Sequence, residues 1–202
     1  GILYPTSGEV LVNGFVPWER KNEFKRSFAI VMGQKNQLWW DLPASDSLYL
    51  NKCIYDVDDR EYKKTVDELS ELLGVRELMN IQVRRLSLGE RMKMEILAAL
   101  IPRPGILFLD EPTIGLDIVS QQKIRDFLHY YNEQTKTTVI LTSHYMRDIE
   151  ALCSRAVIIN SGTLVYDGAL SDINHRMGDK RLLTLSFSSP VETGKLSIFG
   201  RV

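Results

Sequence analysis

The sequence has little of several features that mark particular classes of protein. Its two cysteines, Cys53 and Cys153, stand too far apart for a metal-binding spacing and make no disulfide framework. No apolar run approaches the roughly 18 residues of a membrane-spanning helix, and the first residues lack the basic-then-apolar order of a secretion signal. The formal net charge is −1, which gives no electrostatic footprint for nucleic acid. We therefore expect a protein of the reducing cytosol with no nucleic-acid partner.

The remaining composition fits an ordinary globular domain. Of the 202 residues, 44% are hydrophobic, which is enough for one buried core with a short appendage. Residues 1–5 resemble the tail of a helix, and the pattern breaks off at Val202 with no closing element. We expect both ends to be cut, so that the sequence is a fragment of a longer protein.

The order of apolar residues predicts an α/β fold. Residues 8–14 alternate like a strand and close on Asn13-Gly14, a strong turn signal. From 38 to 100 the period is helical, with a helix over 58–73 that ends at Gly74. The other expected strands cover 27–32, 106–109, 138–142, 156–160, 163–167 and 182–187, and the other expected helices cover 91–100, 118–134 and 146–152, with Ser171 capping a last one. Alternating strands and helices favour a mostly parallel sheet.

Two carboxylates, Asp110 and Glu111, follow the apolar strand expected over 106–109. Ligands of open α/β sheets bind at the carboxyl ends of strands, and adjacent strand residues point in opposite directions. One carboxylate can therefore hold Mg²⁺ through water while the other orients or deprotonates an attacking water. Taken alone, a strand that ends in a polar turn explains the pair equally well.

His144 follows the next expected strand, 138–142, and shares that edge if the two strands are neighbours. A neutral imidazole there could hydrogen-bond a terminal phosphate and the attacking water. Without that setting, a solvated histidine or one that begins a helix is the better explanation. His129 and His175 have no comparable setting, and we assign them no role.

Three further places could serve a phosphate or a metal. Ser87 and Glu90 form a capping box before a helix, whose free N–H groups also suit an anion, and Gly89 lets a phosphate approach the backbone. Gln34, at the end of an apolar run, can offer an amide oxygen to Mg²⁺. Asp117 fits a plain helix N-cap. Each signal is weak by itself.

Together, these places resemble the motif series of ABC ATPase domains. The family has five motifs in a fixed order, the Q-loop, signature, Walker B, D-loop and H-loop. The same order is followed here by Gln34, residues 86–90, residues 106–111, residues 115–117 and His144. The resemblance covers residues 1 to about 175. It implies a P-loop-NTPase-like core with an antiparallel β hairpin region and an inserted helical subdomain.

The resemblance also implies a role for each site residue. Asp110 and Gln34 would hold Mg²⁺, Glu111 would polarise water, and His144 would sense the γ-phosphate of ATP. The residues that would contact ATP, directly or across a dimer, are Gln34, Ser87, Gly89, Glu90 and Asp117. The implied function is the ATP-hydrolysing motor subunit of an ABC transporter, with export as a weaker suggestion from the last segment.

The implied partners are a transmembrane permease subunit and a second nucleotide-binding domain, identical or not, that pairs head to tail. The protein would work at the cytosolic face of the membrane. We expect an N-terminal β part over 1–37, a helical subdomain over 38–100, a core with the catalytic motifs over 101–175, and the start of a C-terminal appendage over 176–202.

Two departures from the family pattern matter. Leu88 and Glu90 stand where the signature has a glycine and a glutamine. No Gly-x-x-x-x-Gly-Lys-[Ser/Thr] stretch occurs, so the Walker A loop that supplies most of the phosphate contacts is missing. We expect this chain alone to bind ATP poorly and the intact protein to hydrolyse it. The alternatives are a soluble ABC-type ATPase with no membrane partner and a catalytically inert fragment.

Overall fold

A computed structural model describes residue 1 and residues 3–177 of the chain, which divides into two compact units, Gly1–Cys153 and Ser154–Val202. The strand expected over 182–187, and the appendage expected over 176–202 apart from its first two residues, lie outside the described residues.

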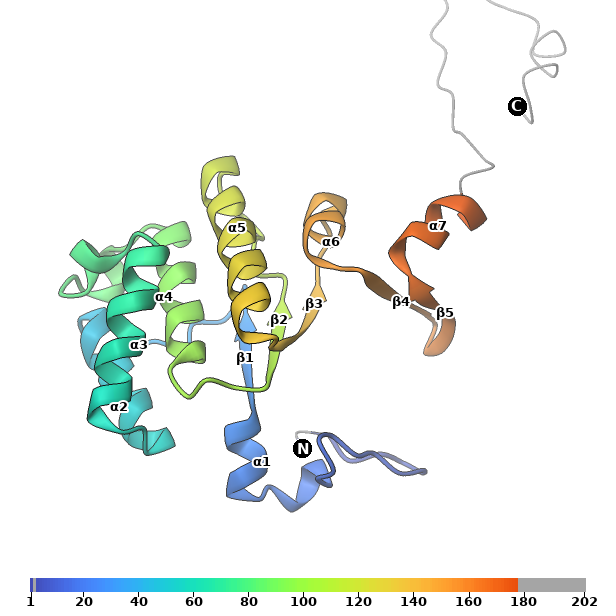
Figure 1. The fold of residues 1–202 in the computed structure, drawn as a ribbon, viewed down its shortest axis with the longest axis horizontal. Coiled ribbons are helices and arrows are strands. Elements are labelled where there is room, and N and C mark those ends of the chain that lie inside the picture. The colour runs from blue at the N-terminus through green and yellow to red at the C-terminus, as the bar shows by residue number, and fades with distance from the viewer. Residues whose placement is uncertain (2, 178–202) are drawn as a thin grey trace, which may run out of the picture. The chain divides into compact units, whose positions relative to one another are not determined.

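A three-stranded parallel sheet forms the centre of the first unit. Its strands are β1 (Phe28–Met32), β2 (Ile106–Asp110) and β3 (Thr138–Thr142), in the order β1-β2-β3 (Figure 1). The pairing aligns Val31 with Leu109 and Leu141, and this row of side chains packs into the core. The last row of the same register joins Met32, Asp110 and Thr142, so the polar residues lie at the carboxyl end of the sheet.

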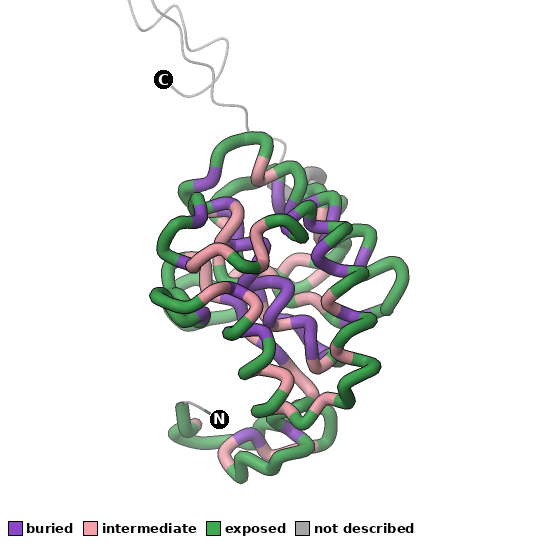
Figure 2. The backbone as a smooth tube through the Cα atoms, turned by 90° about the vertical axis from the view of Figure 1, so that its left-hand side faces the viewer, coloured by how far each residue is buried: buried purple, intermediate pink, exposed green. Residues whose placement is uncertain are grey.

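Five of the six α-helices in the described part of the unit follow β1 in the chain. They are α2 (Ala44–Tyr55), α3 (Asp59–Leu72), α4 (Leu88–Leu100), α5 (Ile118–Thr135) and α6 (Met146–Leu152). Helix α4 is buried on almost every side, because it packs against β1, α2, α3 and α5 together. Its fully buried side chains include Met94, Ile96 and Leu97. Figure 2 shows buried backbone gathered in the interior, whereas residues 1–16 are mostly exposed.

Most helix ends fall where the sequence places them. Asp58 caps α3 by accepting hydrogen bonds from the N–H groups of Arg60 and Glu61, and Gly74 follows with a φ of 63°. Ser87 caps α4, which begins at Leu88 rather than at the expected residue 91. A short helix, α1 (Asn22–Ser27), was not expected at all.

The prediction of a strand over residues 8–14 is wrong. Only Val12 and Phe15 pair, around a turn in which Asn13 and Gly14 have positive φ, so the turn signal is right but no ladder extends from it. Residues 8–11 alternate in hydrophobicity without a partner strand, and an isolated pair of strands is marginally stable in water.

The second unit contains an antiparallel hairpin of β4 (Arg155–Asn160) and β5 (Thr163–Ala169), followed by α7 (Leu170–Met177). The hairpin confirms the sequence prediction, and its turn places Ser161 and Gly162 at positive φ. The expected cap at Ser171 is wrong, because α7 continues directly from β5 and Ser171 lies inside it.

In the part of the chain that the structure describes, no helix combines the length and the apolar character needed to cross a lipid bilayer.

Candidate active site

The carboxyl end of the sheet brings Asp110 and Thr142 together. They occupy the same row of the β2–β3 pairing, and the Thr142 hydroxyl donates a hydrogen bond of 2.6 Å to Oδ1 of Asp110. Asp110 is exposed, so the carboxylate keeps acceptor capacity toward solvent. Sequence reasoning missed Thr142 as its partner.

The backbone turns sharply at Glu111. Its φ is 52°, a left-handed conformation that costs a side chain bearing a Cβ about 1–2 kcal/mol. Two hydrogen bonds hold the turn, from the Glu111 N–H to the Thr142 carbonyl at 3.0 Å and from the Ile114 N–H to the Glu111 carbonyl at 3.2 Å. Residues kept in sparsely populated backbone regions cluster at functional sites, where surrounding contacts maintain them.

Glu111 and His144 meet at this edge. The distance from Nε2 of His144 to Oε1 of Glu111 is 2.7 Å, which is close enough for an ion pair or a hydrogen bond between the two side chains. The Glu111 side chain is 20% exposed and the imidazole 79% exposed. Among the described residues, Oε2 of Glu111 is buried and has no hydrogen-bond partner. A shielded carboxylate oxygen with spare acceptor capacity is suited to bind a water or a ligand proton.

The end of β1 lies beside the same carboxylates. The Gly33 N–H donates to the Asp110 carbonyl at 2.8 Å, and a Cβ added to Gly33 would overlap the Glu111 carbonyl, whose carbon lies 2.9 Å from that position. Gln34 follows in an exposed turn. Within the described residues its side chain makes no hydrogen bond to Asp110 or Glu111. The structure therefore places Gln34 near the edge without joining it to the acids.

Glu95 of α4 anchors the segment that follows Gln34, and sequence reasoning missed it. Its Oε1 accepts hydrogen bonds from the N–H groups of Gln37 at 2.8 Å and Leu38 at 3.2 Å. Burial raises the pKa of this carboxyl, and the two backbone hydrogen bonds oppose that rise. Helix α4, which Ser87 caps, is thus bonded to the loop that carries Gln34.

The second group of expected site residues lies at the start of α4. Ser87 and Glu90 close the predicted capping box, since Oε2 of Glu90 accepts from the Ser87 N–H at 2.8 Å and the Ser87 hydroxyl accepts from the Glu90 N–H at 3.3 Å. These bonds lower the pKa of Glu90, the backbone bond most. No hydrogen bond links this group to Glu111 or His144 within the described residues.

Asp117 and Gly89 connect the start of α4 to the start of α5. Asp117 caps α5, as predicted, by accepting from the Ser120 N–H at 2.9 Å and from its hydroxyl at 2.6 Å. The Ser120 bonds, the hydroxyl first, lower the pKa of Asp117. A Cβ on Gly89 would lie 2.8 Å from Cβ of Ser120, so only glycine fits there. The side chain of Leu88 lies against Gly115.

The donor set at the sheet edge fits a hard divalent cation. Within the described residues, no group of three or more histidines, cysteines or acids could enclose a metal ion. Mg²⁺, however, is usually held by one or two carboxylates, waters and substrate phosphates. The exposed Asp110 carboxylate, with one oxygen fixed by Thr142, meets that requirement.

Comparisons with known proteins agree with this fold. The ABC transporter family profile matches residues 1–114. The ABC transporter ATP-binding protein NatA of Bacillus subtilis is 34% identical over 172 residues, which is 85% of this chain and 70% of NatA. The linearmycin resistance ATP-binding protein LnrL of the same organism is 33% identical over 188 residues, 93% of this chain and 60% of LnrL. The chain belongs to the ABC transporter family and is a partial nucleotide-binding domain.

A solved structure described as the ATP-binding subunit of an ABC transporter superposes with a TM-score of 0.76 at 25% identity, covering 88% of this chain and 73% of that one. The chain also resembles a small part of much longer proteins. It is 28% identical to the human ATP-binding cassette sub-family A member 10 over 97% of this chain, but that is only 13% of the human protein.

Proposed function

We propose that the protein is the ATP-binding and hydrolysing motor subunit of an ABC transporter. The observation that carries the proposal is the pair of Glu111 and His144, in contact at 2.7 Å with one buried carboxylate oxygen left free. The sheet edge that holds this pair is where α/β proteins bind nucleotides.

On this proposal, Glu111 is the general base and His144 positions it. The attacking water donates a hydrogen bond to the Glu111 carboxylate and passes its proton to it as the water oxygen attacks the γ-phosphate of ATP, whose bond to the bridging oxygen breaks so that ADP leaves. Because the imidazole is largely exposed, its N–H can turn from Glu111 to a γ-phosphate oxygen when nucleotide is bound. Asp110 and Gln34 would hold Mg²⁺, which supplies positive charge to the phosphates.

The second group of residues would act on another subunit. We propose that Ser87, Gly89, Glu90 and Asp117 face ATP held by a second nucleotide-binding domain, packed head to tail, and that ATP closes this dimer. This proposal is supported by the N-termini of α4 and α5, which lie next to each other at Gly89 and Ser120. Free N–H groups at a helix N-terminus attract phosphate. Whether the second domain is identical stays open.

The remaining assignments are proposals of the same kind. A transmembrane permease would dock on the helical region 38–100, where the side chains of Trp39, Trp40 and Tyr49 are exposed, and this would hold the protein at the cytosolic face of the membrane. The domains would divide at 37, 100 and 175. Because the sequence contains no Walker A loop, these 202 residues alone would bind and hydrolyse ATP weakly.

We propose export as the direction of transport, since one relative is named for linearmycin resistance. Import is the alternative, because a molybdenum import ATP-binding protein, ModC, is 30% identical over 177 residues. A transport assay in sealed vesicles decides between them.

The test compares ATP hydrolysis by the full-length protein with that of Glu111→Gln. We expect kcat to fall about 10²-fold or more, the usual loss when a general base is removed, while ATP binding is retained. Glu150→Gln is the matched control, because Glu150 is an exposed acid on α6, and it should leave kcat unchanged. Equal turnover by Glu111→Gln and the wild type would refute the assignment.

A further inference from the structure

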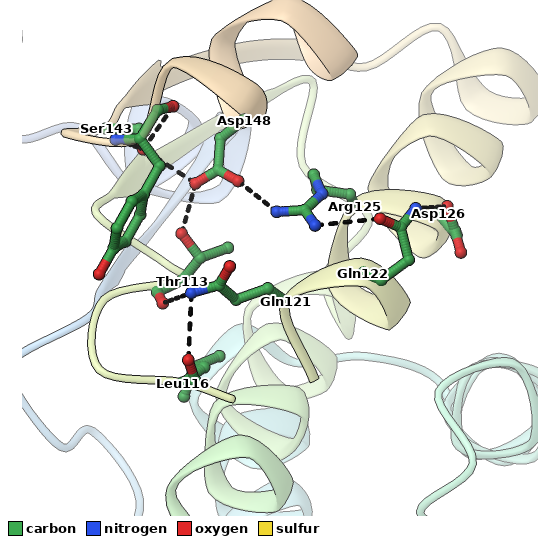
Figure 3. Close-up of polar contacts among 9 residues, drawn as sticks. Thr113, Leu116, Gln121, Gln122, Arg125, Asp126, Ser143 and Asp148 are labelled. Atoms are coloured by element: carbon green, nitrogen blue, oxygen red, sulfur yellow. Dashed lines mark hydrogen bonds and ion pairs between the residues drawn. The ribbon is translucent and has the colours of Figure 1, made fainter. Parts of the chain in front are cut away.

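A buried carboxylate bonds the two segments that follow β2 and β3. Asp148 in α6 has no solvent exposure, and its two oxygens accept hydrogen bonds from three side chains. Oδ2 accepts from the hydroxyls of Thr113 and of Ser143, the latter at 2.8 Å, and Oδ1 accepts from Nη1 of Arg125 at 2.7 Å. Figure 3 shows these side chains converging on Asp148, and we call the four residues the Asp148 cluster.

The partners of Asp148 stand next to the proposed catalytic residues in the chain. Thr113 lies two residues after Glu111, and Ser143 directly precedes His144. One carboxylate oxygen thus bonds both the loop that carries Glu111 and the segment that carries His144. Arg125 reaches the same carboxylate from α5, so it fixes the group against a third element.

The bonds around the cluster extend this anchoring. Ser143 also accepts from the Tyr145 N–H at 3.0 Å, which closes a turn around His144. Gln121 of α5 donates to the Leu116 carbonyl at 3.1 Å, on the loop that includes Thr113 (Figure 3). Arg125 donates to the Gln122 side chain at 3.0 Å. The loops on both sides of the Glu111–His144 contact are therefore tied to α5 and α6.

Packing cannot fix His144 by itself. Its side chain is 79% exposed, so few neighbours restrict the ring. Apart from the bond to Glu111, its position depends on the backbone that Ser143 anchors. Glu111 likewise sits in a left-handed conformation that needs outside support.

Stability alone does not explain a charged cluster at this place. Burying an ion pair removes both charges from water, and well-packed apolar residues of similar volume often stabilise a fold as well or better. Apolar residues cannot accept directional hydrogen bonds from the hydroxyls of Thr113 and Ser143, whereas the Asp148 carboxylate does. The cluster is thus suited to setting geometry.

We propose that Asp148 is a positioning residue for ATP hydrolysis. It holds Thr113 and Ser143 so that Glu111 and His144 meet, and it touches neither the nucleotide nor the water itself. This inference rests on the proposed function, because it assumes that Glu111 and His144 act on ATP.

The decisive variant replaces the ion pair with apolar side chains, Arg125→Met with Asp148→Leu, in the full-length protein. It removes the acceptor for both hydroxyls without leaving a charge unpaired, so the melting temperature should fall less than in Asp148→Leu alone. We expect kcat for ATP to fall about tenfold or more from the misplaced groups, with KM changed less than about twofold. An unchanged kcat would overturn the inference.

Two milder variants cover the case in which the double replacement does not fold. Ser143→Ala removes the hydroxyl that ties the segment of His144 to Asp148. Thr113→Val removes the hydroxyl that ties the loop of Glu111 to Asp148. Each should lower kcat about threefold to tenfold at constant KM, an effect of the order expected for loss of one positioning bond. Asp167→Asn, in the exposed Arg155–Asp167 pair, is the control and should leave kcat alone. Unchanged kcat in both hydroxyl variants would overturn the inference.

A spectroscopic measurement separates this inference from the proposed function. In full-length protein labelled with ¹⁵N at histidine, the imidazole signals of His144 should shift in Ser143→Ala and Thr113→Val, while those of His129 should not. Unmoved His144 signals overturn the inference even if ATP is hydrolysed. A wild type without ATPase activity refutes the proposed function, yet shifted His144 signals would still support the positioning by Asp148.

Discussion

The end of the sheet and the start of α4 use similar groups in opposite ways. At the sheet, Glu111 bonds His144 with one oxygen and keeps the other buried and free. At α4, Glu90 and Ser87 bond each other reciprocally. The first arrangement leaves a hydrogen-bond acceptor available for a reactant. The second satisfies backbone N–H groups at the start of its own helix.

The two sites also differ in their effect on stability. Glu111 is held at a φ of 52°, which costs about 1–2 kcal/mol that the rest of the fold must offset. The capping box contributes about 1 kcal/mol to the helix it starts. Glu111, with its strained backbone and one oxygen free to accept a hydrogen bond, is suited to catalysis. The capping box of Ser87 and Glu90 is suited to a rigid surface, as the proposed contact with another subunit would need.

The largest effect in this comparison is expected from Gly33→Ala. The added Cβ would overlap the Glu111 carbonyl, which is backbone and cannot move aside alone, so the turn at Glu111 must shift. We expect a loss of about 1–3 kcal/mol in the free energy of unfolding, typical of overpacking, and a marked fall in kcat. Urea unfolding and an ATPase assay of the full-length protein measure both.

Gly105→Ala is the matched control for that variant. Gly105 lies at the opposite end of the sheet, before β2, and its added Cβ would make only ordinary contact, 3.7 Å from the Ser27 carbonyl oxygen. Stability should change by less than about 1 kcal/mol. If both variants behave alike, close approach to Glu111 is not the reason for Gly33.

A smaller effect is expected from Ser87→Ala. The change removes the hydroxyl that accepts from the Glu90 N–H, so the free energy of unfolding should fall by about 1 kcal/mol. If the capping box is also the surface that meets a second subunit, the ATP concentration that half-saturates hydrolysis should rise as well. A change in stability without any change in that concentration would restrict Ser87 to its helix.

The smallest effect is expected from Glu90→Gln, and it depends on pH. The Ser87 bonds lower the pKa of Glu90 in the folded state below its unfolded value. The associated stability is thus present at neutral pH and lost as the pH falls through the folded-state value. The group is half-buried and screened, so Glu90→Gln should remove only a few tenths of a kcal/mol at pH 7.

Urea unfolding of the wild type and Glu90→Gln at neutral and acidic pH measures this difference. The two curves should converge in acid, where Glu90 is protonated in both folded and unfolded states. A constant difference between them at every pH would mean that the charge of Glu90 has no part in the capping box.

The sequence predicts best the elements whose signals are local. The apolar run ending in Asp110 and Glu111, the capping box at Ser87 and the cap at Asp117 are each specified by a few neighbouring residues, and the structure has all of these local features. The juxtaposition of Glu111 with His144 needed one assumption, that the two strands are neighbours, and β2 does pair with β3.

What the sequence could not predict depends on residues far apart in the chain. Asp148 meets Thr113 across 35 positions, and Glu95 meets Gln37 across 58. Their identities carry no pattern, since a single acid on a helix is usually a solvated surface residue. The strand expected over 8–14 failed for the same reason, because a strand needs a partner that local alternation does not provide.

The most direct test of the account is a double-mutant cycle on Glu111 and His144 in the full-length protein. Turnover of ATP is measured for Glu111→Gln, His144→Ala and the two changes together. Because the residues act as a unit, we predict that each single change lowers kcat strongly and that the double variant is little slower than the slower single one. Losses that multiply, as for two independent residues, would contradict the account.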